Sequence, residues 1–263
     1  MSLIKGAELS TKDTDRTWEY YGSADPYYGV LTSDDYRRTA MTPDMKAKFF
    51  DSGRQYVDVV LGIIKAELDV SFQPKTALDF GCGVGRLVIP LAKICTQVTG
   101  VEISASMIEE AKKNCREQGI SNVSIVKSDD TLSQVSGSFD LVHSYIVFQH
   151  IAPDRGETIL RRLIDVLRGD GVGVLQFTYF SKNTPTRKLL MRAYKHMPFM
   201  YSFRNLLKGR PFREPLMQMN EYNLNRIFRI LQDTGCHRCG IRFTDHNMYG
   251  IIIFFQKKRQ DML

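Results

Sequence analysis

Three glycines at alternate positions follow a short apolar run that ends in an acidic residue. They are Gly81, Gly83 and Gly85, within ALDFGCGVGRL at 77–87. Because glycine has no Cβ, such a turn lets the backbone approach a ligand closely, and a helix after the turn offers its N-terminus to the same ligand. This is nucleotide-binding chemistry. The dinucleotide pattern GxGxxG is nevertheless incomplete, because Arg86 stands where its third glycine belongs.

Acidic residues near the ends of neighbouring apolar runs narrow the choice of ligand. Glu102 lies about twenty residues beyond the first glycine, where a carboxylate can accept hydrogen bonds from ribose hydroxyls. Asp129 and Asp130 end the run NVSIVKSDD, where a carboxylate can accept from an adenine amino group, and Ile103 could cover the adenine face. Asp79 would repel a diphosphate and attract an ammonium group. These residues fit a nucleoside with an amino-acid tail better than a dinucleotide.

Alternating strands and helices must position these residues. A helix is expected from Pro43, with Thr42 as its cap, and Asp154 with Glu157 resembles a capping box at the start of another. Strand–helix alternation predicts a doubly wound, mostly parallel sheet of the α/β class. The last two strands are joined too closely for a parallel crossover, so an antiparallel hairpin is expected there. Strands are expected at 76–80, 97–102, 123–127, 139–144, 171–178, 238–244 and 251–257, and further helices at 84–94, 104–119 and 221–234.

These motifs resemble those of the class I S-adenosylmethionine-dependent methyltransferases. The quoted turn resembles that family's first motif, VTGVEIS its second, VSIVKSDD its third and FDLVHSYIVFQHI its fourth, while LRGDGVGVLQFT resembles the segment around its fifth strand. The resemblance covers residues 45–178 well and the last 45 residues more loosely. It implies a seven-stranded Rossmann-like fold whose last strand inserts antiparallel, with S-adenosylmethionine as cofactor.

The resemblance also assigns roles to single residues. The glycine turn with Cys82 would wrap the methionine portion of the cofactor, and Asp79 would lie near its ammonium group. Glu102 would hold the ribose, and Asp129 would meet the adenine amino group. The other expected cofactor contacts are Ile103, Ser128, Asp130, Ser144 and Tyr145.

The acceptor side is less defined by the sequence. His150, after the fourth strand, is a candidate general base, with a structural role in the turn as the equal alternative. His143 lies within that strand and is expected to pack inside the sheet. The fourth motif, SYIVFQH, lacks the Pro-Pro-Tyr and Pro-Cys runs of nucleobase-methylating relatives. The candidate substrate residues are Tyr20, Tyr21, Tyr28, Gln149, Lys188, Arg192 and Lys195.

Basic charge is concentrated in one segment. Residues 179–215 carry a net charge of +8, whereas the whole 263-residue chain carries +7, so the remainder is slightly acidic. We interpret residues 1–41 as a loop-rich aromatic arm and candidate lid, and 42–263 as a methyltransferase domain with a basic lid-like insertion at about 179–220. Such an insertion would attract an anionic small molecule, a membrane surface or nucleic acid.

The composition sets the remaining expectations. Five irregularly spaced cysteines, no apolar run long enough to span a membrane and no signal-like start favour a cytoplasmic protein. The CxxC at 236–239 lacks a second ligand pair, so no metal is expected. The function expected is methyl transfer to a small anionic or hydroxylated molecule. The alternatives are a lipid head group, RNA, a non-catalytic cofactor-binding protein and a NAD-dependent oxidoreductase.

Overall fold

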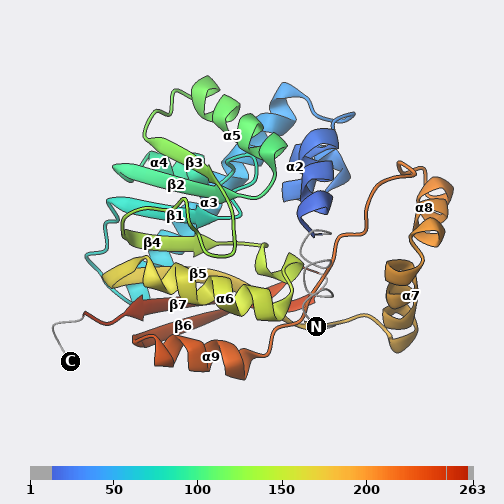
Figure 1. The fold of residues 1–263 in the computed structure, drawn as a ribbon. Helices are drawn as coiled ribbons and strands as arrows, with labels where there is room; N and C mark the ends of the chain where they lie inside the picture. The colour runs from blue at the N-terminus through green and yellow to red at the C-terminus, as the bar shows by residue number, and fades with distance from the viewer. Residues whose placement is uncertain (1–13, 247, 260–263) are drawn as a thin grey trace.

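The computed structural model describes residues 14–246 and 248–259. Its centre is a seven-stranded sheet in the order β3-β2-β1-β4-β5-β7-β6 (Figure 1). Neighbouring strands are parallel except that β7 runs antiparallel between β5 and β6. The expected α/β sheet with its antiparallel hairpin is therefore confirmed. The strands are β1 (Thr76–Phe80), β2 (Gln97–Glu102), β3 (Val123–Lys127), β4 (Phe139–Ser144), β5 (Leu167–Ser181), β6 (Cys236–Asp245) and β7 (Met248–Lys257).

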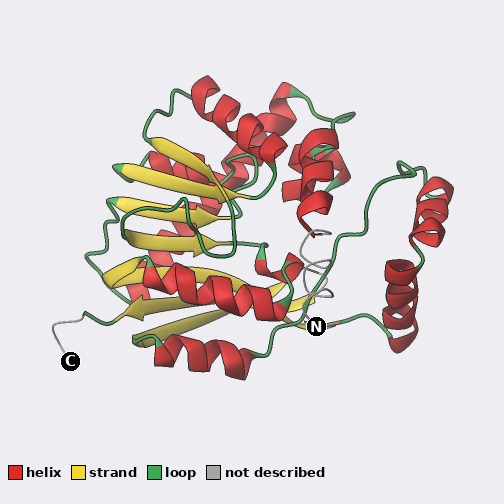
Figure 2. Ribbon diagram, in the orientation of Figure 1, coloured by secondary structure: helices red, strands yellow, loops and turns green. Residues whose placement is uncertain are grey.

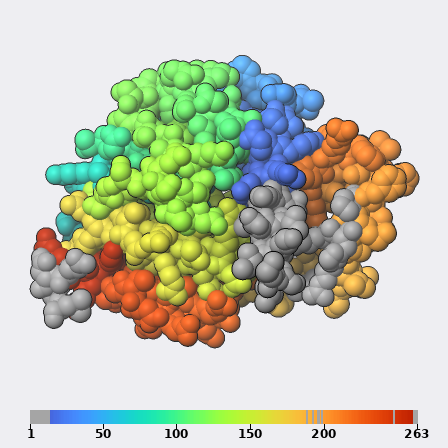
Figure 3. Space-filling model, in the orientation of Figure 1, coloured from blue at the N-terminus to red at the C-terminus, as the bar shows by residue number. Residues whose placement is uncertain are grey.

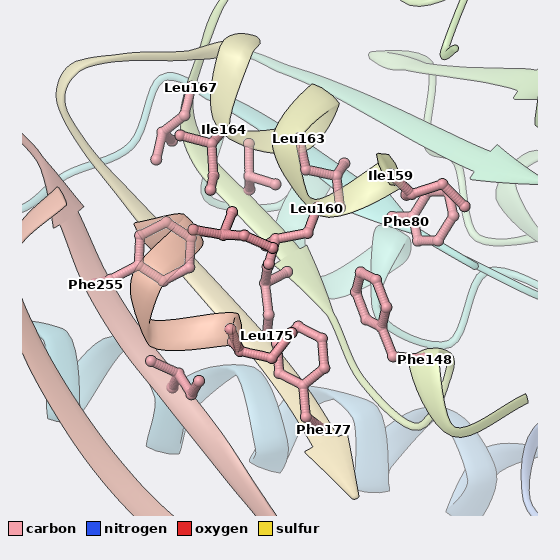
Figure 4. Packing of buried hydrophobic residues seen from close by; sticks show 14 of the residues in the cluster. Phe80, Phe148, Ile159, Leu160, Leu163, Ile164, Leu167, Leu175, Phe177 and Phe255 are labelled. Atoms are coloured by element: carbon pink, nitrogen blue, oxygen red, sulfur yellow. The ribbon is translucent and has the colours of Figure 1, made fainter. Parts of the chain in front are cut away.

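Helices cover both faces of this sheet (Figure 2). Side chains of successive strand residues point to opposite faces, so Leu78 and Phe80 join the core under α6 (Pro153–Asp165) and α9 (Leu224–Asp233). Ala77 joins the core under α3 (Pro43–Glu67) and α4 (Val88–Ala92). Figure 4 shows the first of these cores, where α6 presents Leu160 and Leu163 to the sheet. α5 (Ala105–Glu117) packs beside β2 and β3.

The helix starts agree with the sequence in part. The hydroxyls of Thr42 and Ser104 accept hydrogen bonds from the N–H groups of Met45 and Met107, both at 3.2 Å, and so cap α3 and α5. The capping box expected at Asp154 is wrong. α6 begins at Pro153 without a side-chain cap, since proline needs no partner for an N–H at that position.

The helix expected at 84–94 is also wrong in length. Residues 83–87 form turns, and α4 keeps only five residues. Gly85 has φ of +90°, which is not helical, and Pro90 supplies no N–H donor. The glycine turn is therefore longer than the sequence pattern indicated.

Two segments lie at the carboxyl ends of the parallel strands. The arm was expected to be loop-rich but is helical at 14–24, in α2 (Pro26–Val30) and in the short η1 (Asp34–Tyr36). Its aromatic rings pack with Phe49 into a third core, which explains the ordered helices. The basic insertion forms two helices, α7 (Pro185–His196) and α8 (Pro198–Leu207), which stand at the margin of the molecule (Figure 1).

Candidate cofactor site

A cavity opens at the carboxyl ends of β1, β2 and β4, and the space in it, open solvent included, is about 730 Å³. Parallel α/β sheets bind their ligands at this edge. Gly81 and Gly83 form one wall, Glu102, Ile103 and Ser128 form the next, and the segment after β4 forms the third. The arm closes it with Thr14, Asp15, Trp18, Gly29 and Val30.

The glycine turn has a conformation that other residues tolerate poorly. Gly81 has φ of +74° and Gly83 has φ of +53°. A Cβ on Gly81 would lie 2.4 Å from the Val147 side chain, and one on Gly83 would lie 2.5 Å from Val30. Glycine at these positions therefore lets the turn lie against both the β4 segment and the arm.

Glu102 is a buried carboxylate at the end of β2. Its Oε2 accepts from the N–H of Gly83 at 2.9 Å, and its Oε1 accepts from the N–H groups of Ile103 and Ser104 at 2.8 and 2.9 Å. Burial raises the pKa of this carboxyl, while the three N–H donors oppose that shift. Since each carboxylate oxygen has two lone pairs, Oε2 keeps capacity to accept from a ligand hydroxyl.

The segment after β4 holds a strained residue. Ile146 has φ of +61°, which is unusual for a β-branched side chain. Its N–H donates to Gln176 Oε1 at 3.2 Å, and its neighbours Tyr145 and Val147 line the cavity with it. Backbone strain of this kind occurs where a binding site needs a specific conformation.

Comparisons with known proteins agree on one family. A model of methyltransferase domains matches residues 77–171. Carboxy-S-adenosyl-L-methionine synthase of Nautilia profundicola is 25% identical over 67% of this chain and 76% of its own length. The crystal structure of magnesium protoporphyrin IX methyltransferase from Synechocystis PCC 6803 with bound SAH superposes with a TM-score of 0.59, at 21% identity, over 92% of this chain and 98% of that one.

Residues 77–171 form a methyltransferase domain, within a chain that has the fold of S-adenosylmethionine-dependent methyltransferases. Another relative, a ubiquinone biosynthesis O-methyltransferase of Caulobacter vibrioides, is 33% identical over 38% of this chain and 40% of its own length. The chain thus spans three quarters of one curated relative and less than half of the other. These relatives are named for different reactions, so their names do not identify the acceptor of this methyltransferase.

The predicted cofactor residues of this methyltransferase separate into two groups. The cavity is lined by Gly81, Gly83, Glu102, Ile103, Ser128 and Tyr145. Asp79, Cys82, Asp129, Asp130 and Ser144 are not among its lining residues.

Three of those five side chains lie inside the sheet packing. Asp79 Oδ1 lies 2.8 Å from Nδ1 of His143 on the α3 face of the sheet. Cys82 joins the core under α3 and α4, and the hydroxyl of Ser144 donates to the carbonyl of Phe80 at 2.9 Å. Their expected contacts with the cofactor stay predictions.

The two aspartates after β3 have local partners. Asp129 accepts from the hydroxyls and N–H groups of Thr131 and Ser133. The hydrogen bond from the Ser133 hydroxyl is the largest of the influences that lower the Asp129 pKa to about 2. Asp130 accepts from Arg155 Nε at 2.6 Å, and Arg155 also donates to Asp15 of the arm. Asp129 therefore shapes the loop, and Asp130 holds an arginine that lines the cavity.

His150 lines the cavity, but its nitrogens are both engaged. Nδ1 donates to the carbonyl of Gln218 at 2.8 Å, so Nε2 is the acceptor and takes a hydrogen bond from the amide of Gln149 at 3.1 Å. Burial lowers the His150 pKa to about 4. This environment favours the structural role over the base. His143 packs inside the sheet as expected, with Nε2 lying 3.2 Å from the hydroxyl of Tyr56.

The predicted substrate residues are not brought together. Tyr21 and Tyr28 are buried in the arm's own core, the hydroxyl of Tyr21 donates to the carbonyl of Pro215, and Tyr20 packs on Tyr21. Gln149 is buried behind His150. The side chains of Lys188, Arg192 and Lys195 lie outside the described residues.

Sequence reasoning missed two residues near the cavity. Trp18 lines it and packs edge-on against His150 with ring centroids 4.8 Å apart. Nε2 of His246, in the hairpin between β6 and β7, lies 2.9 Å from the hydroxyl of Tyr145. Trp18 belonged to the aromatic cluster of the arm, whereas no motif marked His246.

Two further findings concern metals and membranes. Across residues 14–246 and 248–259, no three His, Cys, Asp or Glu side chains gather in a way that would hold a metal ion. Within the same ranges, no helix has the length and apolar character needed to cross a bilayer.

Proposed function

We propose that this protein transfers the methyl group of S-adenosylmethionine to a small-molecule acceptor. The observation that carries the proposal is the cavity that joins the glycine turn, Glu102 and the strained segment at Tyr145 and Ile146. The activated methyl is the cofactor's own chemistry. The protein's task is to orient cofactor and acceptor so that the acceptor atom attacks in line as the S–CH3 bond breaks.

The lining residues suit the parts of the cofactor. Glu102 would accept from the ribose hydroxyls, and the apolar side chains of Phe80, Ile103 and Ile151 would enclose the adenine. The turn at Gly81 and Gly83 would lie along the methionine portion. Tyr145 and Ile146 would then border the methyl group, and the acceptor would bind beside the β4 segment.

His246 is the imidazole best placed to take a proton from the acceptor through the Tyr145 hydroxyl, which lies 2.9 Å from its Nε2. It is exposed, it contacts the cavity wall through Tyr145, and burial of part of its ring lowers its pKa. It is therefore neutral near pH 7 and able to accept a proton. Replacing it with glutamine should remove the acidic limb of the pH–rate profile and leave cofactor affinity unchanged.

Labelled methyl transfer tests the proposal. The protein would be incubated with S-adenosylmethionine carrying a radioactive methyl group and, separately, with a small-metabolite extract, lipid vesicles or total RNA. We expect label in the small-molecule fraction. Label in lipid or RNA alone would contradict the acceptor class. Cofactor binding without transfer to any fraction would favour a non-catalytic protein, and binding of NAD with no binding of S-adenosylmethionine would indicate an oxidoreductase.

A further inference from the structure

The guanidinium of Arg86 is buried beside the cofactor cavity without an acidic partner. The residue is 6% exposed, Nη1 donates to Ser52 Oγ at 3.4 Å, and Nε has no hydrogen-bond partner. Among the described residues, no carboxylate oxygen lies within ion-pair distance of Arg86. Asp79, the acid of β1 that precedes the glycine turn, lies 2.8 Å from Nδ1 of His143.

Two stacked tyrosines lie beside this cation, and one of them lines the cavity. The Arg86 Cζ lies 5.9 Å from the ring centroid of Tyr56 and 6.0 Å from that of Tyr145. The two rings stack with centroids 4.2 Å apart, and Tyr145 lines the cavity. Arg86 is not itself a lining residue, but it lies one side-chain layer behind the wall that would border the methyl group.

A buried cation without an anion is costly, because burial removes its hydration and nothing replaces it. Ring contacts stabilise a cation less than an ion pair does. Burial also lowers the Arg86 pKa, which agrees with the missing partner. Such a group is stabilised when a ligand supplies the anion.

We propose that Arg86 receives a carboxylate of a bound ligand at the Tyr145 end of the cavity. This proposal rests on the proposed function. The carboxylate has two sources, the methionine portion of the cofactor or an acidic acceptor, and the planar donor fork of arginine matches either one.

The test removes the cation and the carboxylate separately. Arg86→Met keeps the aliphatic stem and loses the charge. S-adenosylmethionine and its decarboxylated analogue would be titrated into both proteins, and benzoate would be titrated into both proteins loaded with S-adenosylhomocysteine. If the cofactor supplies the anion, the native protein should bind S-adenosylmethionine at least about tenfold more tightly than the analogue. The variant should bind the two alike.

The other outcomes are equally defined. If the acceptor supplies the anion, benzoate should bind the loaded native protein and not the loaded variant. Equal behaviour of the two proteins in both titrations would overturn the proposal. If the native protein binds no S-adenosylmethionine, the proposed function fails instead. Thermal unfolding distinguishes a ligand-binding role of Arg86 from a structural one. If Arg86 binds a ligand, loss of its unpaired buried charge should leave the ligand-free variant at least as stable as the native protein.

A second inference concerns the exposed face of the insertion. Of the seventeen large apolar side chains that are exposed in the described part of the chain, nine lie between 189 and 212. On α8 they are Phe199, Met200, Phe203, Leu206 and Leu207, with Phe199 and Leu207 each 74% exposed. The insertion lies beside the arm at the surface (Figure 3).

Helical spacing gathers these residues on one side of α8. Residues 199, 203 and 206 follow steps of four and three, which places them on one face. Tyr201 and Asn205 are buried on the opposite face, where the amide of Asn205 donates to the carbonyl of Glu214 at 2.8 Å. The helix is therefore fixed by its polar side and presents its apolar side outward.

Basic residues lie in the same segment as that apolar face. Arg187, Lys208 and Arg213 are exposed in the same segment, whose net charge is +8, while the rest of the chain is slightly acidic. An apolar face with basic flanks complements the interface of an anionic bilayer, where apolar side chains enter the acyl boundary and cations meet the phosphates. We infer that α8 docks this methyltransferase on an anionic lipid surface.

Vesicle sedimentation tests the docking. The native protein should sediment with vesicles of phosphatidylcholine and phosphatidylglycerol and much less with phosphatidylcholine alone. The triple variant Phe199→Ser, Phe203→Ser, Leu207→Ser should lose this binding, whereas Phe243→Ser, at an exposed apolar residue of β6, should keep it. Neutralising Arg187, Lys208 or Arg213 should weaken binding by roughly fivefold each.

Four results would overturn the inference. In the first, the native protein does not sediment with the anionic vesicles. In the second, Phe243→Ser loses binding as fully as the triple variant. In the third, RNA binds to the segment while vesicles do not. A native dimer that the triple variant converts to a monomer would assign the face to a second copy of the chain and would also overturn the inference.

Discussion

Burial and local partners decide what each candidate residue can do. In the sequence, Glu102 and Asp129 occupy equivalent positions, because each is an acid near the end of one of two consecutive strands. In the fold, Glu102 is buried in the cavity wall, whereas Asp129 is held by Thr131 and Ser133 of its own loop. A strand position places a carboxylate at the correct edge, but the next few residues determine whether it faces a ligand.

The buried His150 should make stability depend on pH. Its pKa is lowered to about 4 from the ordinary 6.5, so the folded protein favours the neutral ring. The neutral ring of His150 makes its full contribution to the free energy of unfolding above pH 6.5. This contribution is lost as the pH falls toward 4, because the histidine takes up a proton more readily in the unfolded chain than in the folded protein. The loss amounts to about 3 kcal/mol. Urea unfolding at pH 7 and pH 4.5 would measure it.

His150→Gln is the matched variant for that measurement. Glutamine can still donate to the carbonyl of Gln218 and accept from Gln149, but it does not titrate. The free energy of unfolding of the variant should therefore fall less between the two pH values than that of the native protein. The same fall in both proteins would show that His150 is not the group that titrates.

At the scale of elements, the arm is the feature that the sequence described least well. Its clustered tyrosines suggested a cleft, but they form the arm's own core, and Trp18, Gly29 and Val30 reach the cavity instead. Glu19 fastens the arm to α5 through the hydroxyls of Ser104 and Ser106. Composition revealed an ordered aromatic segment, but not which rings face inward, because that depends on contacts distant in sequence.

Trp18 should report cofactor binding directly. It is the only tryptophan of the chain and it lines the cavity, so S-adenosylhomocysteine should change its fluorescence. Trp18→Phe should abolish the signal while weakening affinity by less than about 1.5 kcal/mol, since an aromatic contact is retained. Calorimetric binding without any change in tryptophan emission would place the ligand away from the arm.

At the scale of the whole molecule, the sheet was the most predictable part. Four strands, β1 to β4, have the bounds expected from apolar runs and turns, and the antiparallel hairpin followed from a short connection. The glycine turn and Glu102 were predictable because their place in the site follows from their position at the end of a strand. Contacts made only by folding were not predictable, as the positions of Asp79, Arg86 and His246 show.

Titration of S-adenosylhomocysteine into the native protein and into Glu102→Gln tests whether the cavity holds this cofactor through Glu102. Glutamine keeps one acceptor oxygen and removes the charge that Gly83, Ile103 and Ser104 surround. We predict binding to the native protein and an affinity lowered by about 1–3 kcal/mol, or roughly five- to 150-fold, in the variant. Unchanged affinity in an equally stable variant, or native binding of NAD in place of S-adenosylhomocysteine, would contradict the account.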